Sequence, residues 1–366
     1  MALACPAQIT YSARMKLDES LIRDADLRAK LEEKRGTAGF DFQLMALLSE
    51  QRTRDEKAAR KAELDALPRE KRRRAIVRGV FESGAPTRAD IRHIHSVLAV
   101  CGLPHERLSL DVRSYSCEQG RMALDVTAGT LRDHNGAPYV QPLPYGPKAR
   151  LVLMHLCSEA VRQKSATIEI ADSFTAFVRD MGFSTEGGKR GTLTAFKDQL
   201  NALAACTMRI SSWDGRSVKT KNITPLDEID LWLSGDPAQR SLWPSTVTFS
   251  SPMFESLKLH AVPVNANAVK AFAGSSRKLD LYFWLGWRLS NIEDPLHLSW
   301  DALKPQFGAG FTRQRDFHRK FAEELGHILE VFPKAPVKLT EKGLILQPAD
   351  PDVLALPAPR PIKPRA

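Results

Sequence analysis

Four segments of the sequence carry residue types that can bind metal, phosphate or nucleic acid. His93-Ile-His95 has the spacing of the metal-binding histidine pair found in enzymes that nick single-stranded DNA. Gly187-Gly188-Lys189-Arg190 has the glycines and the lysine of a phosphate-binding loop. Two helical segments, residues 189–205 and 312–332, place arginines and lysines beside an apolar stripe, as DNA-binding helices do. Each of these chemistries depends on the element that carries the residues.

The histidine pair fits a metal site only on a strand, where alternate residues share one face. The pattern from Arg88 to Val100, with Thr87 as a cap, predicts a helix instead. No clear Tyr-x-x-x-Lys nucleophile follows the pair. A nicking enzyme using His93 and His95 therefore stays an alternative, and we expect no enzymatic activity, no catalytic residue and no metal site.

The glycine-rich stretch departs from a nucleotide-binding loop at two positions. Phe183 stands where the first glycine is required, and Arg190 follows the lysine in place of serine or threonine. We therefore expect neither nucleotide hydrolysis nor a cofactor.

The segment 312–332 carries the strongest signal for nucleic-acid binding. Apolar residues at helical spacing predict its buried stripe: Phe317, Phe321, Leu325, Ile328 and Phe332. Basic residues fill the first half, and a recognition helix enters the major groove by its positive N-terminal end. Arg315 and Arg319 either donate to guanine edges or pair with Asp316 and Glu323 on an ordinary solvated face. The expected contacts are Thr312, Arg313, Arg315, His318, Arg319 and Lys320, with Lys342 in the following turn.

The segment 189–205 resembles it but carries a weaker outer face. Leu193, Phe196, Leu200 and Leu203 predict its buried stripe, and the opposite face is nearly neutral. Such a helix suits phosphate contacts or dimerisation better than base recognition. The expected contacts on it and on the hairpin that follows are Lys189, Arg190, Thr194, Lys197, Arg216 and Lys219.

The two basic helices occupy equivalent places in a duplicated pattern. Each copy opens with an apolar helix, at Leu151 or Leu279, and then meets a polar helix cap, Asp172 or Ser299. A short helix, a glycine turn, the basic helix and a two-strand hairpin follow in both copies. This order is that of a winged helix-turn-helix. The sequence therefore predicts an α+β fold with two tandem winged helix-turn-helix domains behind a helical, basic N-terminal extension. The predicted hairpin turns are Asp214-Gly215-Arg216 and Glu341-Lys342-Gly343.

Changes in composition suggest where these domains begin and end. We expect an extension over residues 1–85, winged domains over 86–235 and 236–348, and a proline-rich tail over 349–366. The extension ends in the basic run Arg69 to Arg74. That run is either a solvated helix or flexible arm, or an arm lying on DNA phosphates.

Charge and cysteine usage restrict the class of protein. A net charge of +10 favours a polyanionic partner. The five cysteines form no Cys-x-x-Cys pair, which suits a reducing cytoplasm better than a disulfide framework. No apolar run is long enough to span a bilayer. We expect a cytoplasmic protein without membrane contact.

Several motifs in order resemble the plasmid-encoded RepA family of replication initiators. They include Leu143-Pro-Tyr-Gly-Pro-Lys-Ala-Arg-Leu, Ile170-Ala-Asp-Ser-Phe-Thr-Ala-Phe, Phe196-Lys-Asp-Gln-Leu, Phe254-Glu-Ser-Leu-Lys-Leu-His-Ala-Val-Pro-Val, Leu279-Asp-Leu-Tyr-Phe-Trp-Leu and Ser299-Trp-Asp-Ala-Leu-Lys-Pro-Gln-Phe-Gly. The resemblance runs from about Pro142 to Gln347 and leaves the first hundred residues uncovered.

The resemblance implies a non-catalytic initiator of bacterial plasmid replication. Such proteins use tandem winged helices to bind repeated origin sites (iterons), distort the origin DNA, and recruit the host initiator and replicative helicase. Relatives also form homodimers and repress their own promoter. The matching sites here are the helices Arg313 to Lys320 and Gly188 to Lys197. A transcriptional repressor of the same fold is a further alternative.

Overall fold

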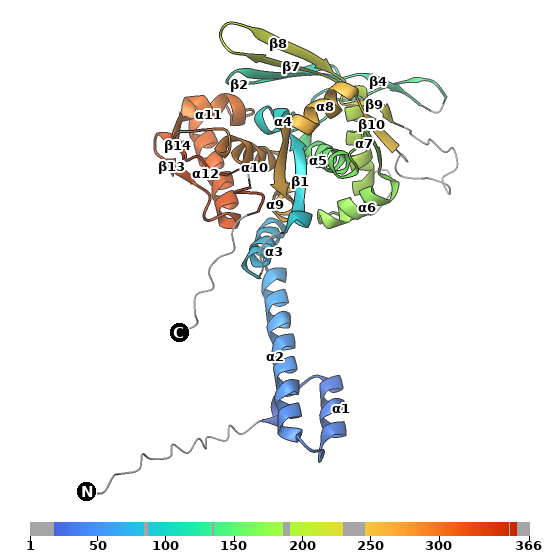
Figure 1. Cartoon of the computed structure of the whole chain (residues 1–366), viewed down its shortest axis with the longest axis vertical. Coiled ribbons are helices and arrows are strands. Elements are labelled where there is room, and N and C mark those ends of the chain that lie inside the picture. The colour runs from blue at the N-terminus through green and yellow to red at the C-terminus, as the bar shows by residue number, and fades with distance from the viewer. Residues whose placement is uncertain are drawn as a thin grey trace, which may run out of the picture. The chain divides into compact units, whose positions relative to one another are not determined.

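The computed structural model describes residues 18–83, 87–133, 135–185, 191–229, 246–350 and 352–356. The chain, drawn whole in Figure 1, divides into two compact units, Met1–Pro68 and Arg69–Ala366, called here the N-terminal unit and the main unit. The first unit thus ends earlier than the expected extension at residue 85. The reason is that the helix α3, Arg69–Ser83, packs within the main unit. No helix of the described ranges is long and apolar enough to cross a membrane.

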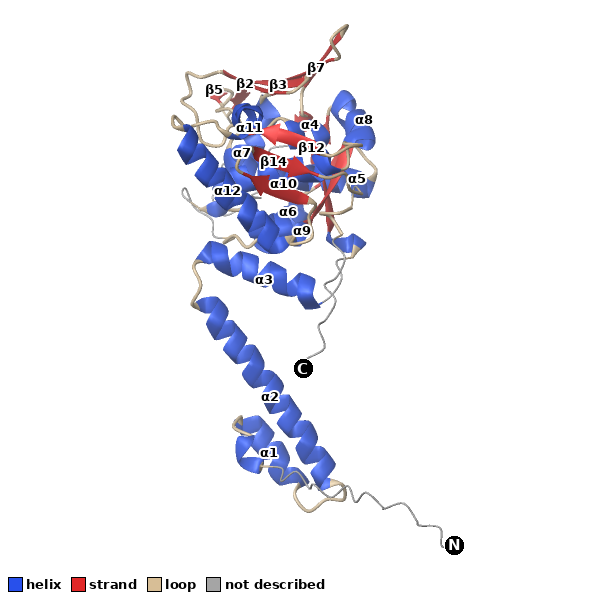
Figure 2. Cartoon of the chain, turned by 90° about the vertical axis from the view of Figure 1, so that its left-hand side faces the viewer, coloured by secondary structure: helices blue, strands red, loops and turns tan. Residues whose placement is uncertain are grey.

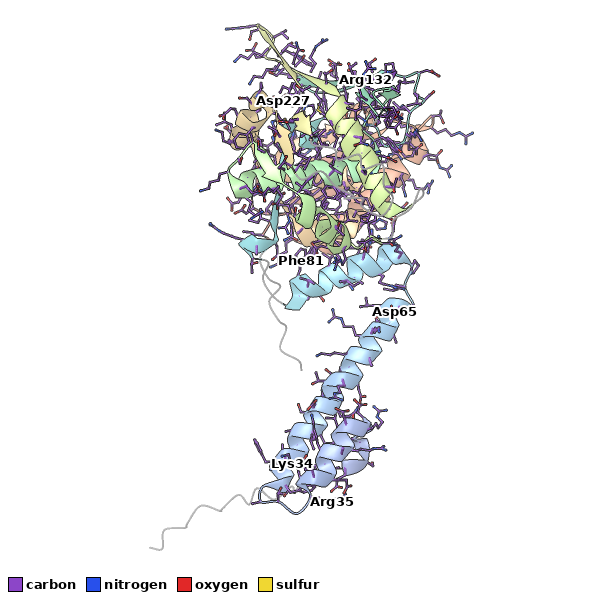
Figure 3. All side chains as sticks on the ribbon, turned by 90° about the vertical axis from the view of Figure 1, so that its right-hand side faces the viewer. Lys34, Arg35, Asp65, Phe81, Arg132 and Asp227 are labelled. Atoms are coloured by element: carbon purple, nitrogen blue, oxygen red, sulfur yellow. The ribbon has the colours of Figure 1, made fainter. Side chains whose placement is uncertain are left out.

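The N-terminal unit is a helical hairpin with its own small core. It contains the 3₁₀ turn η1 (Glu19–Leu21), α1 (Ala25–Lys34) and α2 (Phe40–Asp65). Lys34 and Asp65, the last residues of the two helices, are labelled in Figure 3. The core holds Leu27 and Leu31 of α1 against Leu44 and Leu47 of α2. The buried Gln51 side chain accepts hydrogen bonds from the backbone N–H groups of Arg23 and Asp24, both at 3.0 Å. This amide fixes the start of α1 against the middle of α2.

The second predicted repeat folds into three helices and a three-stranded antiparallel sheet. Its elements are α10 (Ser276–Leu289), β12 (Leu296–Ser299), α11 (Trp300–Phe307), α12 (Gln314–Val331), β13 (Val337–Thr340) and β14 (Gly343–Leu346), and the strand order is β12-β14-β13. Ser299 caps α11, because its Oγ accepts a hydrogen bond from the N–H of Ala302 at 3.2 Å. The predicted cap and the predicted hairpin are confirmed here.

The first repeat has the same helix order and the same sheet order. Its elements are α5 (Gly146–Gln163), β6 (Thr167–Glu169), α6 (Ala171–Asp180), α7 (Thr192–Ala205), β9 (Leu226–Ile229) and β10 (Thr246–Phe249), with strand order β6-β10-β9. Asp172 was expected to cap α6, but Ile170 occupies the cap position and Asp172 lies inside the helix. The expected division at residues 235 and 236 falls between β9 and β10, which pair within this sheet.

The hairpin at Asp214-Gly215-Arg216 forms as predicted but belongs to another sheet. It joins β7 (Thr207–Trp213) to β8 (Val218–Ile223) in a four-stranded sheet of order β2-β3-β7-β8. The other two strands, β2 (Ser114–Gln119) and β3 (Met122–Thr127), precede the repeat, and β3 pairs with β7 from Met122–Ser212 to Thr127–Thr207. The hairpin is therefore an addition to the first repeat, and β9 and β10 take the place expected for it. It projects from the main unit in both Figure 1 and Figure 2.

The expected helix from Arg88 to Val100 is wrong. The segment consists of a 3₁₀ turn η2 (Arg88–Asp90), the strand β1 (Ile91–His95) and the short helix α4 (Ser96–Val100). The capping box of Thr87 and Asp90 is present, but it closes only the 3₁₀ turn. The strand forms because β11 (Ala261–Asn265), far along the chain, pairs with it antiparallel over its whole length. His93 and His95 thus do share one face of a strand.

The remaining elements of the main unit are two short exposed strands and two helices that pack beside this strand pair. They are β4 (Thr130–Arg132), β5 (Pro138–Val140), α8 (Ser251–His260) and α9 (Ala266–Phe272). One continuous cluster of buried apolar side chains runs through both repeats, from Leu153 and Phe196 to Leu285 and Phe321. The two repeats therefore share a core rather than forming separate globules.

A buried ion pair joins the first helices of the two repeats. Arg150 of α5 donates to both carboxylate oxygens of Asp280 of α10, at 2.5 and 2.6 Å. The same guanidinium donates to the carbonyl oxygens of Leu103, Pro104 and Gly146. Arg150 is 3% exposed, so its charge is compensated entirely by these protein groups. We call this arrangement the inter-repeat clamp.

Breaking the clamp on one side should destabilise the main unit strongly. Arg150→Met deprives the buried Asp280 carboxylate of both guanidinium hydrogen bonds and leaves His105, whose Nδ1 lies 3.6 Å away, as its neighbour. We expect the free energy of unfolding to fall by about 3–5 kcal/mol in urea denaturation. Arg150→Met/Asp280→Leu removes both charges and should recover part of that loss. A single variant as stable as the wild type would show that the pair does not hold the repeats together.

Helix α3 contacts both repeats through residues of the basic run. Arg73 donates to the carbonyl oxygen of Gly182 at 2.7 Å, and its guanidinium lies 5.0 Å from the ring centre of Phe183, after α6. Arg74 is 5% exposed and donates to Glu330 of α12 at 2.8 Å. Phe81, labelled in Figure 3, packs against Phe332 with ring centres 5.7 Å apart. The expectation of a free or phosphate-bound arm is therefore wrong for these residues, because each of them contacts a partner far along the chain.

Arg74→Ala should act on stability and not on DNA contacts. Loss of the ion pair leaves Glu330 without its donor, and we expect about 1–3 kcal/mol of destabilisation in urea denaturation. The dependence of duplex DNA affinity on salt should keep its slope, because Arg74 neutralises no phosphate. Glu330→Gln, which removes the other charge of the same ion pair, is the matched variant. A shallower salt slope for Arg74→Ala alone would contradict this placement.

Candidate nucleic-acid interface

The predicted core stripe of α12 is buried and its opposite face is open. Phe317, Phe321, Leu325 and Ile328 are at most 2% exposed, and Phe332 at the helix end is 3% exposed. On the other side, four of the expected contact residues are exposed: Thr312, Arg313, Arg315 and Arg319. The helical spacing thus separated core from surface as expected.

The start of α12 is held in place by α10. Arg277 of α10 donates to the carbonyl oxygen of Ala309 at 2.6 Å, and its guanidinium lies 4.5 Å from the ring centre of Phe311. Gly310 between them has φ of +84°, a conformation that favours glycine. The turn before α12 is thus fixed, and the arginines at the helix start have a defined direction.

The two arginines on the outer face differ in their surroundings. Among the described residues, Arg315 makes no hydrogen bond or ion pair. Arg319 lies 3.9 Å from Asp316, and the Arg319 side chain is 71% exposed. Such an exposed pair contributes little, so both guanidinium groups are available to an incoming ligand.

Two other expected contacts on α12, His318 and Lys320, have partners within the protein. The His318 ring stacks on Trp300 with ring centres 3.9 Å apart, and the Trp300 indole N–H donates to the carbonyl oxygen of Glu341 at 2.8 Å. His318 therefore packs at the base of the hairpin. Lys320 pairs with Glu323 at 3.0 Å.

The hairpin of the second repeat presents one exposed lysine. Lys342 lies in the turn between β13 and β14 and is exposed. Next to it, Gly343 has φ of +139°, and a Cβ there would lie 2.0 Å from the carbonyl oxygen of Leu298. Only glycine lets β14 approach β12 this closely, so the position of Lys342 depends on its neighbour.

The corresponding helix of the first repeat, α7, offers a less basic surface. Thr194 and Lys197 are half-buried on it, while Lys189 and Arg190 lie outside the described residues. Burial raises the pKa of Asp198, against the opposing effects of Arg107, Lys148 and Lys197. A carboxylate therefore stands among the cations of this face, as the sequence suggested.

The β7–β8 hairpin carries the exposed basic residues expected near the first repeat. Arg216 lies in its turn, where the Arg216 N–H donates to Asp214 at 2.8 Å. Lys219 and Lys221 of β8 are exposed and, by register, share the face of Met122 and Leu124. The cations are thus present, on the four-stranded sheet rather than beside α7.

The histidine pair on β1 is tied into the protein. The Nδ1 atom of His95 accepts a hydrogen bond from the N–H of Val97 at 3.1 Å, so its Nε2 carries the proton and donates to Ser256 Oγ at 2.9 Å. Burial lowers the pKa of His95 to about 4. Both ring nitrogens are therefore engaged. In the described part of the chain, no group of three or more His, Cys, Asp or Glu side chains could hold a metal ion.

His95 should make folding sensitive to pH. Its pKa is about 4 in the folded protein against an ordinary 6.5, so the unfolded chain binds an additional proton between these values. Stability should therefore fall as pH drops from 6.5 toward 4. His95→Asn keeps a capping side chain and removes this titration. In urea denaturation, the slope of unfolding free energy against pH should decrease by up to about 1.4 kcal/mol per unit. His93, His105, His155 and His327, whose pKa values are also lowered by burial, contribute to the slope that remains. An unchanged slope would contradict the assignment.

The comparisons with known proteins give one family and one set of structures. Residues 143–302 match the family model described as plasmid encoded RepA protein. A crystal structure of domains 2 and 3 of RctB, from selenomethionine derivatives, is 11% identical with a TM-score of 0.43, covering 70% of this chain and 99% of that one. A second structure of RctB domains 2–3 is also 11% identical, with a TM-score of 0.39, covering 63% and 82%. No curated protein matches the chain. Residues 143–302 of the chain are thus similar to the plasmid encoded RepA protein family.

Proposed function

We propose that this protein initiates plasmid replication by binding repeated sites in duplex origin DNA. The observation that carries the proposal is the outer face of α12, where the exposed Arg315 has no partner among the described residues. The face stands at the N-terminal half of a helix whose other side is fully buried. The match of residues 143–302 to the RepA family model supports the same function.

Each repeat, in this proposal, is a winged helix-turn-helix module. In the second repeat, α11 and α12 form the helix-turn-helix and β13–β14 the wing, so α12 enters the major groove. Its positive N-terminal end then meets the phosphates while Arg315 and Arg319 donate to base edges. Lys342 in the wing lies within the reach of the adjacent backbone. Of the expected contacts on this module, Thr312, Arg313, Arg315, Arg319 and Lys342 are exposed and are proposed to meet bases and phosphates, whereas His318 and Lys320 have partners within the protein.

The first repeat positions the DNA in this proposal. Its helix α7 carries Asp198 among the basic residues, which suits phosphate contacts at the edges rather than base recognition. Thr194, Lys197, Lys189 and Arg190 would serve this role, and the β7–β8 hairpin would add Arg216 and Lys219. Two modules that share a core hold their contacts at a fixed spacing, which suits directly repeated sites.

The bound protein would distort the origin and recruit the host initiator and the replicative helicase, without catalysing a reaction itself. The same surface would serve autorepression through a homodimer on an inverted operator. A nicking activity through the histidine pair finds no support, because both ring nitrogens of His95 bind protein groups.

Arg315→Ala should relax recognition at one base position in each repeated site. We expect a loss of about 1–3 kcal/mol with the preferred base there and little loss with the other bases. Gel-shift titrations with single-substituted sites measure this, and Arg60→Ala on α2 is a matched exposed control. An equal loss for every sequence would assign Arg315 to phosphate contact instead.

The function itself is tested on the non-coding DNA that flanks the coding sequence. Footprinting should reveal directly repeated protected sites, and the protein supplied in trans should support replication of DNA that carries them. Protection of a single inverted site without origin activity would identify a repressor. Metal-dependent cleavage with a covalent tyrosine adduct would identify a nicking enzyme.

A further inference from the structure

Part of the resemblance to the RepA family lies outside the surfaces proposed to bind DNA. Residues 254–264 form most of α8 and β11, and β11 pairs with the strand that carries His93. In both Figure 1 and Figure 2, α8 and α12 lie on different sides of the main unit. The DNA contacts proposed above make no use of this region.

A cavity of 430 Å³ opens between these elements and the end of α5. Its walls are mainly apolar, and its polar groups are His93 and two lysines, Lys164 and Lys258. The lining comprises His93, Ala160, Val161, Lys164, Phe254, Leu257, Lys258, Ala261 and Pro263. Its volume falls within the range of sites that accept a ligand or an anchoring side chain.

The charged groups at this cavity are cationic or already paired. Lys164 is exposed and, among the described residues, makes no ion pair; Lys258 lies 2.7 Å from Glu255 with both side chains at least half exposed. Burial lowers the pKa of His93, so its imidazole is neutral near pH 7. Lys164 also holds a left-handed backbone conformation, with φ of 53°, which positions its side chain at the end of α5. An apolar cavity with two lysines complements an apolar group that bears negative charge.

The backbone at the cavity leaves little room for an added strand. Pro263 has no N–H, and the N–H of His93, opposite it in the register, is bonded to Ser158 Oγ at 2.8 Å. A partner would therefore insert side chains rather than extend the two-stranded sheet. Duplex DNA fits less well, because its backbone offers charge but no apolar group for the walls.

We propose that this cavity docks a partner protein through an apolar side chain flanked by carboxylates. The inference rests on the proposed function, since it gives partner recruitment a surface separate from DNA binding. The apolar side chain enters between Phe254 and Val161, and the flanking carboxylates meet Lys164 and Lys258.

The test uses the full-length protein and labelled dodecapeptides in fluorescence anisotropy. The probe has a Leu-Phe pair flanked on both sides by glutamates, and two control peptides replace the glutamates by lysines or the Leu-Phe pair by serines. Wild-type protein should bind the probe about tenfold more tightly than either control. Phenylpropionate, a small acid with an apolar ring, is tested separately. If it bound as tightly as the probe, the assignment to a protein partner would be overturned.

Two variants separate charge from cavity. Lys164→Gly/Lys258→Gln should weaken probe binding about tenfold, and glycine suits the left-handed conformation at residue 164. Ala261→Phe fills the cavity and should abolish binding with both lysines present. Lys61→Gln on α2 is the matched control and should bind normally.

Binding of the probe that is unchanged in the double variant and in Ala261→Phe would overturn the proposal. The proposal would also be overturned if no protein bound the probe and the double variant lost affinity for random duplex DNA. The two lysines would then bind DNA phosphates rather than a partner protein. Affinity for the origin repeats, measured in parallel, should stay at the wild-type level in every variant. If the wild-type protein did not bind the origin repeats, the proposed function would be rejected. If it bound the repeats but not the probe, only the docking site would be rejected.

Discussion

The bidentate pairing of Arg150 with Asp280 is the constraint on which the arrangement of the main unit depends. It joins equivalent helices of the two repeats inside a shared core, and the same guanidinium also ties down the backbone from Leu103 to Pro104. A buried ion pair adds little net stability compared with apolar packing, but it tolerates very few geometries. The clamp therefore specifies how the repeats face each other more than it strengthens the fold.

The exposed cations of the second repeat stand on elements whose other sides are fixed. The Arg277 guanidinium holds the turn before α12, the Trp300 indole holds the hairpin after it, and α3 bonds to Glu330 near the helix end. The outer face of α12 thus meets a ligand as a rigid surface. Preorganisation of this kind reduces the entropy lost on binding, since few side chains beyond the arginines need to be ordered.

Local sequence patterns predicted the structure of a segment correctly where the residues that it contacts lie close in sequence. The stripe from Phe317 to Ile328 predicted both the buried and the exposed face of α12, and Ser299 predicted a real cap. They failed where a distant partner decides the conformation. The strand at His93 needs β11, the hairpin at Gly215 belongs with β3, and the buried Arg74 donates to the distant Glu330. The cavity at α8 was missed because its lining comes from four elements, although the motif beginning at Phe254 marked one of its walls.

The central claim is that α12 presents Arg315 to the base edges of the major groove. Methylation of guanine N7 blocks a bidentate arginine contact there and leaves the phosphates unchanged. Interference mapping on the origin repeats, with wild-type protein and Arg315→Ala side by side, tests the claim most directly. The account predicts one guanine in each repeat whose methylation prevents wild-type binding and no longer matters to the variant. If methylation at every guanine affected both proteins equally, α12 would not read the sequence through Arg315.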